Sequence, residues 1–145
     1  MMQRALGQAA KAAAMREVPV GAVVYHGSKI LAEAHNLRES DDDPTAHAEI
    51  LAVRRAAHQR GSWRLDGCSI AVTLEPCPMC VGALINARID RLVYGAADPK
   101  MGCVKSLYEL PTDPRFNHRL EVLGNVMADE CGRMLSVFFQ SLRDP

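Results

Sequence analysis

The stretch from Glu75 to Cys80, with the sequence Glu-Pro-Cys-Pro-Met-Cys, constrains the fold of this chain more than any other. A helix that begins at Pro78 turns both thiols toward one point, because proline suits the first helical position, where its missing N–H is not needed. The positive end of such a helix favours thiolate over thiol, and two thiolates suit zinc. Alone, the C-x-x-C spacing also fits a redox pair, half of a zinc knuckle, or two cysteines that merely lie near each other.

A second group of polar side chains, His47 and Glu49, lies upstream in the stretch Pro-Thr-Ala-His-Ala-Glu, which is also typical of a helix start. Taken alone, His47 is more often an ordinary surface histidine, and Glu49 a carboxylate that interacts with the helix dipole. With Cys77 and Cys80, however, His47 makes three metal ligands. Three protein ligands leave the fourth tetrahedral position open, which is the pattern of a catalytic zinc rather than a structural one.

The same arrangement gives Glu49 a role beside the metal rather than on it. Zinc with two thiolates and a neutral imidazole carries about zero net charge and acidifies water weakly, so a nearby general base helps. Glu75 is the other candidate carboxylate, and a structural hydrogen-bond acceptor is the better interpretation of it. The remaining cysteines, Cys68, Cys103 and Cys131, are expected to be small apolar fillers, although Cys103 lies in a long loop, where an exposed thiol is the alternative.

Length and composition favour one domain over residues 1–145, since 48% hydrophobic residues are ample for a single core. The 17 basic and 17 acidic residues give a formal net charge of zero. This neither favours nor excludes a nucleic-acid partner, because a basic patch can lie within a neutral total. We expect no membrane span and no signal peptide, because no apolar run has the required length. Five cysteines without framework spacing favour a reduced, cytoplasmic compartment.

Apolar periodicity predicts an alternation of helices and strands. Helices are expected at residues 2–15, 44–58, 78–87 and 128–142, and strands at residues 20–25, 29–35, 69–74, 91–95 and 120–123. The first two strands are expected to form a hairpin. The next two, joined by a helix, are expected to be parallel. The long loop at residues 96–117 is expected to be functional, because such loops are uncommon in compact domains.

The second helix carries the most detailed prediction. Asp43 is the expected N-cap and Pro44 the first helical residue, and Gly61 is expected to end the helix. The expected apolar stripe consists of Ala46, Ile50, Val53 and Ala57.

The pattern His-Ala-Glu followed by Pro-Cys-x-x-Cys, at this separation, resembles the signature of the zinc-dependent cytidine/deoxycytidylate deaminase superfamily. The finer resemblance is to the bacterial tRNA-specific adenosine deaminases. The matching stretches span nearly the whole chain: residues 16–23, 35–36, 43–50, 72–77, 94–96, 117–119 and 128–131. The zinc motif is specific to the superfamily, whereas the last two stretches indicate the tRNA branch.

This resemblance implies an α/β fold of three layers, α/β/α, with a mixed five-stranded sheet, like that of cytidine deaminase. It implies one Zn²⁺ per subunit, held by His47, Cys77 and Cys80. The implied reaction is hydrolytic deamination of adenosine to inosine at the wobble position of the tRNA anticodon, by a zinc-activated water with Glu49 as the proton shuttle. It also implies a homodimer in which the anticodon stem-loop meets both subunits.

The resemblance extends to residues that contact the substrate. Asn36 matches the residue that hydrogen-bonds the target nucleoside, and Asp98 and Lys100 lie in a loop similar to one that contacts the anticodon. Asn117, Phe139 and Arg143 match positions that contact flanking nucleotides. For Phe139 core packing is an equal alternative, and for Asn117 the alternative is a turn residue. A single-stranded anticodon loop lets the target base be splayed out into such a pocket.

Three other functions stay open at this point. A relative acting on free guanine, cytosine or a nucleoside shares the zinc motif and agrees with the neutral charge, but residues 117–119 oppose it. A zinc-stabilised RNA-binding subunit without activity has no need of Glu49. A thiol redox protein that uses Cys77 and Cys80 predicts activity without zinc and indifference to His47.

Overall fold

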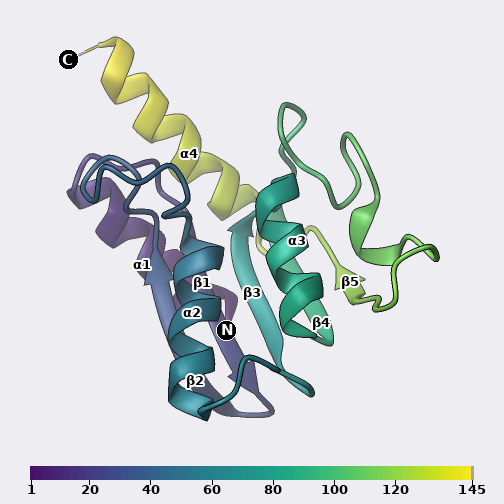
Figure 1. Ribbon diagram of the computed structural model, residues 1–145. Helices are drawn as coiled ribbons and strands as arrows, with labels where there is room; N and C mark the ends of the chain where they lie inside the picture. Colours follow the sequence, from purple (N-terminus) through teal and green to yellow (C-terminus); the bar gives the residue numbers. More distant parts are fainter. Residues whose placement is uncertain (145) are drawn as a thin grey trace.

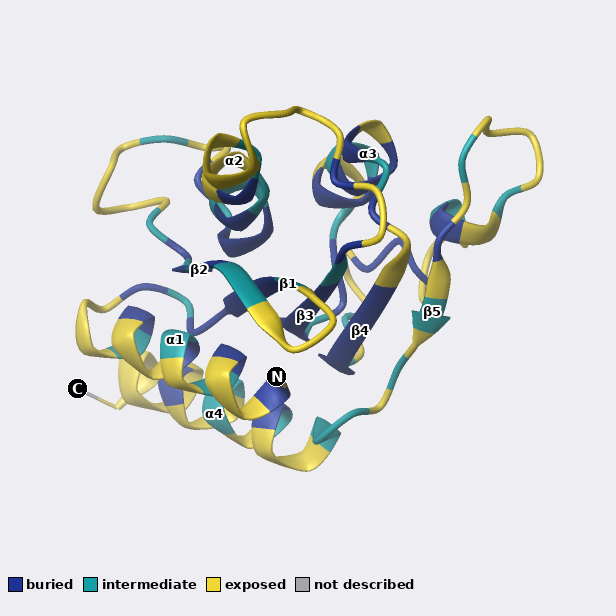
Figure 2. Ribbon diagram, turned by 90° about the horizontal axis from the view of Figure 1, so that it is seen from below, coloured by how far each residue is buried: buried dark blue, intermediate teal, exposed yellow. Residues whose placement is uncertain are grey.

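The computed structural model describes residues 1–144, which form a five-stranded sheet covered by helices on both faces (Figures 1 and 2). In chain order the elements are α1 (Met2–Ala14), β1 (Gly21–His26), β2 (Lys29–His35), α2 (Ala48–Arg60), β3 (Ser69–Leu74), α3 (Pro78–Ala87), β4 (Arg91–Ala96), the 3-10 turn η1 (Leu110–Thr112), β5 (Glu121–Leu123) and α4 (Ala128–Arg143). Within the described residues, no helix is both long and apolar enough to cross a membrane.

The sheet is mixed, with the strand order β2-β1-β3-β4-β5. β1 is antiparallel to both of its neighbours, whereas β3, β4 and β5 are parallel. The predicted hairpin and the predicted parallel pair are therefore confirmed. One consequence of this topology matters for function: β2, β3 and β4 all end at the same edge of the sheet, where β1 begins.

The three predicted layers are also confirmed. α1 and α4 lie on one face of the sheet, and α2 and α3 lie on the other (Figure 2). Neighbouring residues of the central strands face opposite sides of the sheet. Val24 and Ile70 pack toward α2 and α3, whereas Val23 and Ala71 belong to the smaller cluster under α1 and α4. Burial on both faces explains why these strands are nearly continuous apolar runs.

α2 begins at Ala48, four residues later than the predicted start at Pro44. The predicted N-cap, Asp43, instead accepts hydrogen bonds from the backbone N–H and the hydroxyl of Thr45, both at 2.8 Å. Such a local side-chain turn competes with helix formation. The helix therefore starts only after His47, which occupies the N-cap position with extended backbone angles, φ −75° and ψ 150°.

The buried face of α2 differs from the prediction as well. The buried residues of the helix are Ala48, Glu49, Ala52 and Ala56. Of the predicted stripe, Ala46 is buried but precedes the helix, whereas Ile50, Val53 and Ala57 are only partly buried. The helix packs closely on β1 and β2, where alanine fits better than a larger side chain. Gly61 ends the helix as predicted, with a left-handed φ of 74°.

The three cysteines outside the metal motif are buried, which confirms their expected role as fillers. Cys103 is 2% exposed, so the alternative of an exposed thiol is wrong. Burial raises the pKa of Cys103, which keeps this thiol protonated and unreactive.

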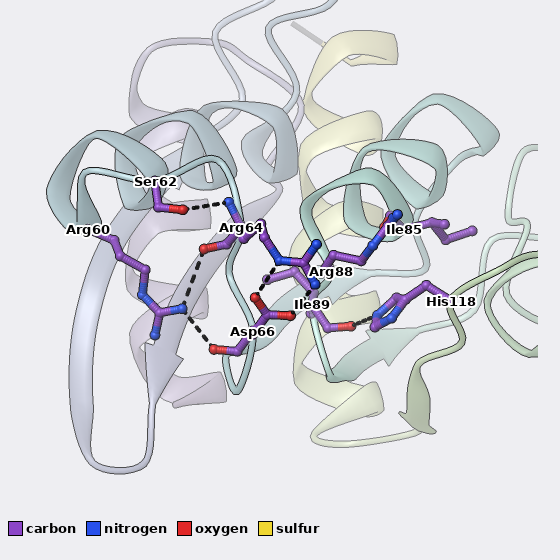
Figure 3. A network of polar contacts seen from close by, with 8 residues as sticks. All are labelled: Arg60, Ser62, Arg64, Asp66, Ile85, Arg88, Ile89 and His118. Carbon is purple, nitrogen blue, oxygen red and sulfur yellow. Dashed lines mark hydrogen bonds and ion pairs between the residues drawn. The ribbon is translucent and has the colours of Figure 1, made fainter.

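At the opposite edge of the sheet, polar contacts lie within the loop that precedes β3, and one joins the turn before β4 to the loop before β5 (Figure 3). Arg64 pairs with Asp66 at 2.9 Å, and Arg60 donates to the carbonyl oxygen of Asp66 at 2.8 Å. His118 contacts the carbonyl oxygen of Ile89 at 2.7 Å through Nε2. This histidine thus contributes to the structure of the loop.

Candidate active site

A pocket of about 320 Å³ lies at the edge of the sheet where β2, β3 and β4 end. The amino-terminal ends of α2 and α3 lie there, at the upper ends of these helices in Figure 1. The lining residues are Val18, Val20, Asn36, Arg38, His47, Ala48, Glu49, Leu74, Glu75, Cys77, Asp98 and Met101. Strand ends of this kind are where open α/β sheets carry their ligand sites.

The three predicted metal ligands, His47, Cys77 and Cys80, come together beside this pocket. His47 is the N-cap of α2 and Cys77 the N-cap of α3, both with extended backbone, so each side chain projects past the first turn of its helix. His47 Nδ1 lies 3.6 Å from Cys77 Sγ and 3.5 Å from Cys80 Sγ. Pro78 starts α3 at the predicted position, which turns Cys80 back toward Cys77.

The thiols of Cys77 and Cys80 differ in pKa because their surroundings differ. The hydrogen bond with Cys80, supported by His47, lowers the pKa of Cys77 to about 4, although burial opposes this. The same hydrogen bond, together with burial, raises the pKa of Cys80. The hydrogen bond with Cys77 also raises the pKa of His47. Cys77 is therefore the thiol that carries the negative charge, and it lies at the positive end of α3.

These three side chains could hold a metal ion. Their ligand atoms all lie within 4.8 Å of one another, and they are the one such group of three found among residues 1–144. One imidazole nitrogen and two thiol sulfurs are donors that zinc binds readily, and three protein donors match the number in catalytic zinc sites. The residues present therefore fit a metal with an open coordination position.

Glu49 lies beside this group, on the second residue of α2. It is 4% exposed, and its carboxyl group neighbours the Cys80 thiol. Burial, followed by the negative charge at Cys77, raises the pKa of Glu49 to about 7. A carboxyl with this pKa exchanges protons readily near neutral pH.

Two of the predicted substrate-contacting residues line the pocket. Asn36 is buried at the end of β2, where its amide donates to the carbonyl oxygen of Val18 at 3.3 Å and accepts from the Arg38 N–H at 3.1 Å. Asp98 lies after β4 and accepts from the N–H groups of Lys100 and Met101 at 3.0 and 3.3 Å. Both side chains are thereby fixed in orientation.

The other four predicted contact residues do not line the pocket. Lys100, Asn117, Phe139 and Arg143 are exposed, the first two on the loop after β4 and the last two on the final turns of α4. Phe139 packs edge-to-face on Phe138, with 5.4 Å between ring centroids, but stays 43% exposed. The core-packing alternative for Phe139 is therefore wrong, because Phe138 is the buried ring.

The structure adds pocket residues that the motifs do not identify. Arg38 and Met101 line the mouth, and Val18, Val20 and Leu74 supply apolar walls. The one sequence signal for them is position: Val18, Val20, Arg38 and Leu74 lie within three residues of the end or the start of a predicted strand, and Met101 lies in the long loop that was expected to be functional. Glu75, expected to be a structural acceptor, accepts five hydrogen bonds from the loop after β4.

A hydrolytic deaminase is the class that this fold and this arrangement of residues define, and comparison with known proteins agrees. The model of the MafB19-like deaminase family matches residues 1–143. The tRNA-specific adenosine deaminase of Bacillus subtilis (strain 168) is 49% identical over 142 residues, which covers 98% of this chain and 88% of that protein. That of Haemophilus influenzae is 47% identical, with 99% and 84% covered.

Solved structures give the same result. A structure from studies of A-to-I editing by tRNA:A34 deaminases at the wobble position of transfer RNA is 40% identical in sequence, with a TM-score of 0.89. The alignment covers 92% of this chain and 97% of that one. The chain belongs to the tRNA-specific adenosine deaminase family.

Proposed function

We propose that this protein hydrolytically deaminates adenosine to inosine at the wobble position of the tRNA anticodon. The observation that carries the proposal is that Glu49, His47 and Cys77 line one pocket at the end of the sheet, with the buried Cys80 beside them. Membership of the tRNA-specific adenosine deaminase family supports adenosine in RNA over a free base as the substrate.

In this proposal, His47, Cys77 and Cys80 hold one Zn²⁺ per subunit. When bound, zinc supplies Lewis-acid activation of a water molecule. Glu49 accepts a proton from the attacking water and donates it to the ring nitrogen N1. It then accepts the second proton of that water from the new hydroxyl group at C6 and donates it to the departing amino group. Adenosine and water thus become inosine and ammonia. The pKa of Glu49, about 7, suits both transfers, because its protonated and ionised forms are both populated near neutral pH.

The pocket walls position the base. Val18, Val20 and Leu74 offer apolar contact to the faces of a purine, and Asn36 is the proposed hydrogen-bonding partner of the nucleoside. The target adenosine has to leave the anticodon stack to enter, which a single-stranded loop permits at low cost.

We propose that the exposed residues outside the pocket serve the rest of the anticodon stem-loop. Lys100 and Asn117 on the loop after β4, and Phe139 and Arg143 on α4, are exposed, which supports a contact with flanking nucleotides. An aromatic ring such as Phe139 can stack on a base, and cationic side chains can contact phosphates.

A homodimer and a cytoplasmic location complete the proposal. Large apolar side chains on the loop after β4, among them Leu107 and Tyr108, are exposed, which is typical of an interaction surface. All five cysteines are free, which agrees with a reducing compartment. Sedimentation velocity tests the dimer; a monomer at all concentrations would contradict it.

The decisive experiment measures inosine formation in total bacterial tRNA, with free adenosine, cytosine and guanine as parallel substrates. Inosine in tRNA that disappears in Glu49→Ala supports both the substrate and the proposed proton carrier. Deamination of a free base alone keeps the chemistry of the site but removes tRNA as the substrate. If no inosine forms, but a thiol–disulfide exchange activity persists after chelation of the metal and in His47→Ala, a thiol redox protein would be favoured instead.

The substitution Asp98→Asn tests the proposed RNA contact on the loop after β4. Asparagine retains the oxygen that accepts from the Lys100 and Met101 N–H groups, so the loop keeps its shape while a negative charge is removed from the pocket mouth. We expect the preference between RNA and DNA stem-loops to change more than the melting temperature. An unchanged substrate preference would remove Asp98 from the specificity-determining residues.

A further inference from the structure

Two loops flank the mouth of the pocket, and each surrounds a buried carboxylate that takes no part in the proposed reaction. The loop after β2 contains Arg38, and the loop after β4 contains Asp98 and Met101; all three side chains line the pocket. In the strand order β2-β1-β3-β4, the two loops lie on opposite sides of the pocket. The two carboxylates belong to Glu17 and Glu75, which are 1% and 2% exposed.

Glu17 holds the loop after β2. Its two carboxylate oxygens accept hydrogen bonds from the backbone N–H groups of Glu39, at 3.0 Å, and Ser40, at 2.6 Å. These two residues directly follow Arg38 in the chain. Burial alone would raise the pKa of Glu17, but the hydrogen bonds from Ser40 and Glu39 lower it. Glu17 is therefore ionised in the folded protein, and its hydrogen bonds are of the strong, charge-assisted kind.

Glu75 holds the loop after β4 in the same way, with more donors. One carboxylate oxygen accepts from the Asp98 N–H at 3.0 Å and from the Ser106 hydroxyl at 2.6 Å. The other accepts from three successive backbone N–H groups, those of Val104, Lys105 and Ser106, at 2.9 to 3.1 Å. Successive N–H groups around one anion form the concave arrangement that elsewhere binds phosphate; here the chain supplies its own anion.

Gly102 gives independent support for close packing of this loop around Glu75. A side chain at Gly102 would collide with the carboxyl group of Glu75 and approach the carbonyl oxygen of Asp98 to 2.5 Å. The Gly102 N–H also donates to that carbonyl oxygen at 2.9 Å. The loop therefore closes on the carboxylate with no room for an additional carbon atom.

We propose that Glu17 and Glu75 are positioning residues that fix the two loops at the pocket mouth and thereby set the separation between Arg38 on one side and Asp98 and Met101 on the other. The two carboxylates act through backbone amides and do not touch the substrate. Their effect is on how well the anticodon loop is accepted. The inference rests on the proposed function for its kinetic consequence but not for the anchoring itself.

The test compares Glu17→Gln, Glu75→Gln and Glu109→Gln with the wild-type protein. Glutamine keeps the size of the side chain, removes the charge and turns an NH₂ group toward the N–H donors. Glu109 is an exposed carboxylate of the loop after β4 without a side-chain cap hydrogen bond, so its variant controls for the loss of charge alone. Amide hydrogen exchange, metal content, and kcat and KM on an anticodon stem-loop RNA are measured for each.

In Glu75→Gln we expect the amides of Val104, Lys105 and Ser106 to exchange at least about tenfold faster, with those of Glu39 and Ser40 unchanged. Glu17→Gln should show the reverse pattern. In both variants KM should rise about tenfold while kcat changes less than about threefold. Glu109→Gln should match the wild type in every measurement.

Unchanged exchange of these amides in both variants would overturn the anchoring. A fall in kcat at constant KM would overturn the role in substrate acceptance. Glu17→Gln keeps the proposal testable if Glu75→Gln does not fold, because Glu17 lies outside the sequence around Cys77. If the wild type makes no inosine, the proposed function fails, and hydrogen exchange, which needs no turnover, still decides the anchoring.

Discussion

Glu49 and Glu75 are both buried and both line the same pocket, yet their acidities differ widely. Burial raises the pKa of Glu49 to about 7. Burial also acts on Glu75, but the hydrogen bonds from Lys105, Ser106 and Asp98 outweigh it and lower the pKa of Glu75 to about 2. The local supply of hydrogen-bond donors thus separates a proton carrier from a permanent anion.

At the residue scale, Glu49→Gln should reduce inosine formation by about 10²–10⁴-fold, because the amide cannot carry the proton. The metal content and the melting temperature should stay near those of the wild type, since the side-chain shape is retained. Single-turnover assays and elemental analysis measure these quantities, with Glu109→Gln as the matched control. Turnover within a factor of about three of the wild type would exclude Glu49 as the proton carrier.

The substitution Cys80→Ala should remove bound metal, because two remaining protein ligands hold zinc poorly. Elemental analysis after gel filtration measures the loss. Cys131→Ala, a change of the same size at a buried cysteine of the other face, should retain full metal content. Equal metal content in the two variants would take Cys80 out of the ligand set.

At the element scale, the start of a helix could be predicted where a proline fixes it. It could not be predicted where a side chain forms a local turn in place of the first helical turn. α3 begins at Pro78, as predicted, and its N-cap carries Cys77. The predicted start of α2 is wrong because Asp43 forms a turn with Thr45. The three predicted metal ligands nevertheless lie close together, since the spacing of the motif does not depend on the helix boundary. The two loops could not be predicted, because nothing local in the sequence indicates that Glu75 accepts hydrogen bonds from residues 104–106.

Contact between α1 and β1 depends on Gly21. A Cβ atom there would collide with the carbonyl oxygen of Ala5 and lie 2.6 Å from the backbone nitrogen of Ala9. Gly21→Ala should therefore lower the free energy of unfolding by about 1–3 kcal/mol, the usual cost of overpacking. Urea denaturation followed by circular dichroism measures the change.

The control for this prediction is Gly132→Ala in α4. A Cβ atom at Gly132 has no neighbour within 4 Å, so the helix should gain about 0.5–1 kcal/mol from the better helix former. Destabilisation of similar size in both variants would contradict the steric explanation for Gly21.

At the scale of the whole molecule, the site is assembled from segments far apart in the chain. Residues next to β1, β2, β3 and β4 all contribute to the pocket, because the mixed topology brings the relevant strand ends to one edge. Fold class and metal motif could be predicted because they depend on periodicity and spacing. The size of the pocket and its walls depend on the packing of four segments, which no single stretch of sequence encodes.

The ionisation of Glu17 predicts how stability depends on pH. Its pKa is lower in the folded protein than the ordinary value of 4.5. A carboxyl of this kind stabilises the fold above its unfolded-state pKa, and the stabilisation is lost as the pH falls through the folded-state pKa. The difference in free energy of unfolding between wild type and Glu17→Gln should therefore be largest near neutral pH and shrink below pH 4.5. A difference that is constant over this range would contradict the prediction.

The β1–β2 hairpin turns at Gly27, which has a left-handed φ of 60° and nothing within 4 Å of a Cβ atom there. This turn lies at the edge of the sheet opposite the pocket, since β1 ends and β2 begins there. A second protein inserted between Gly27 and Ser28 would extend from the domain on the side opposite the pocket. The hairpin tip is thus a natural attachment point for cargo on an RNA-editing enzyme.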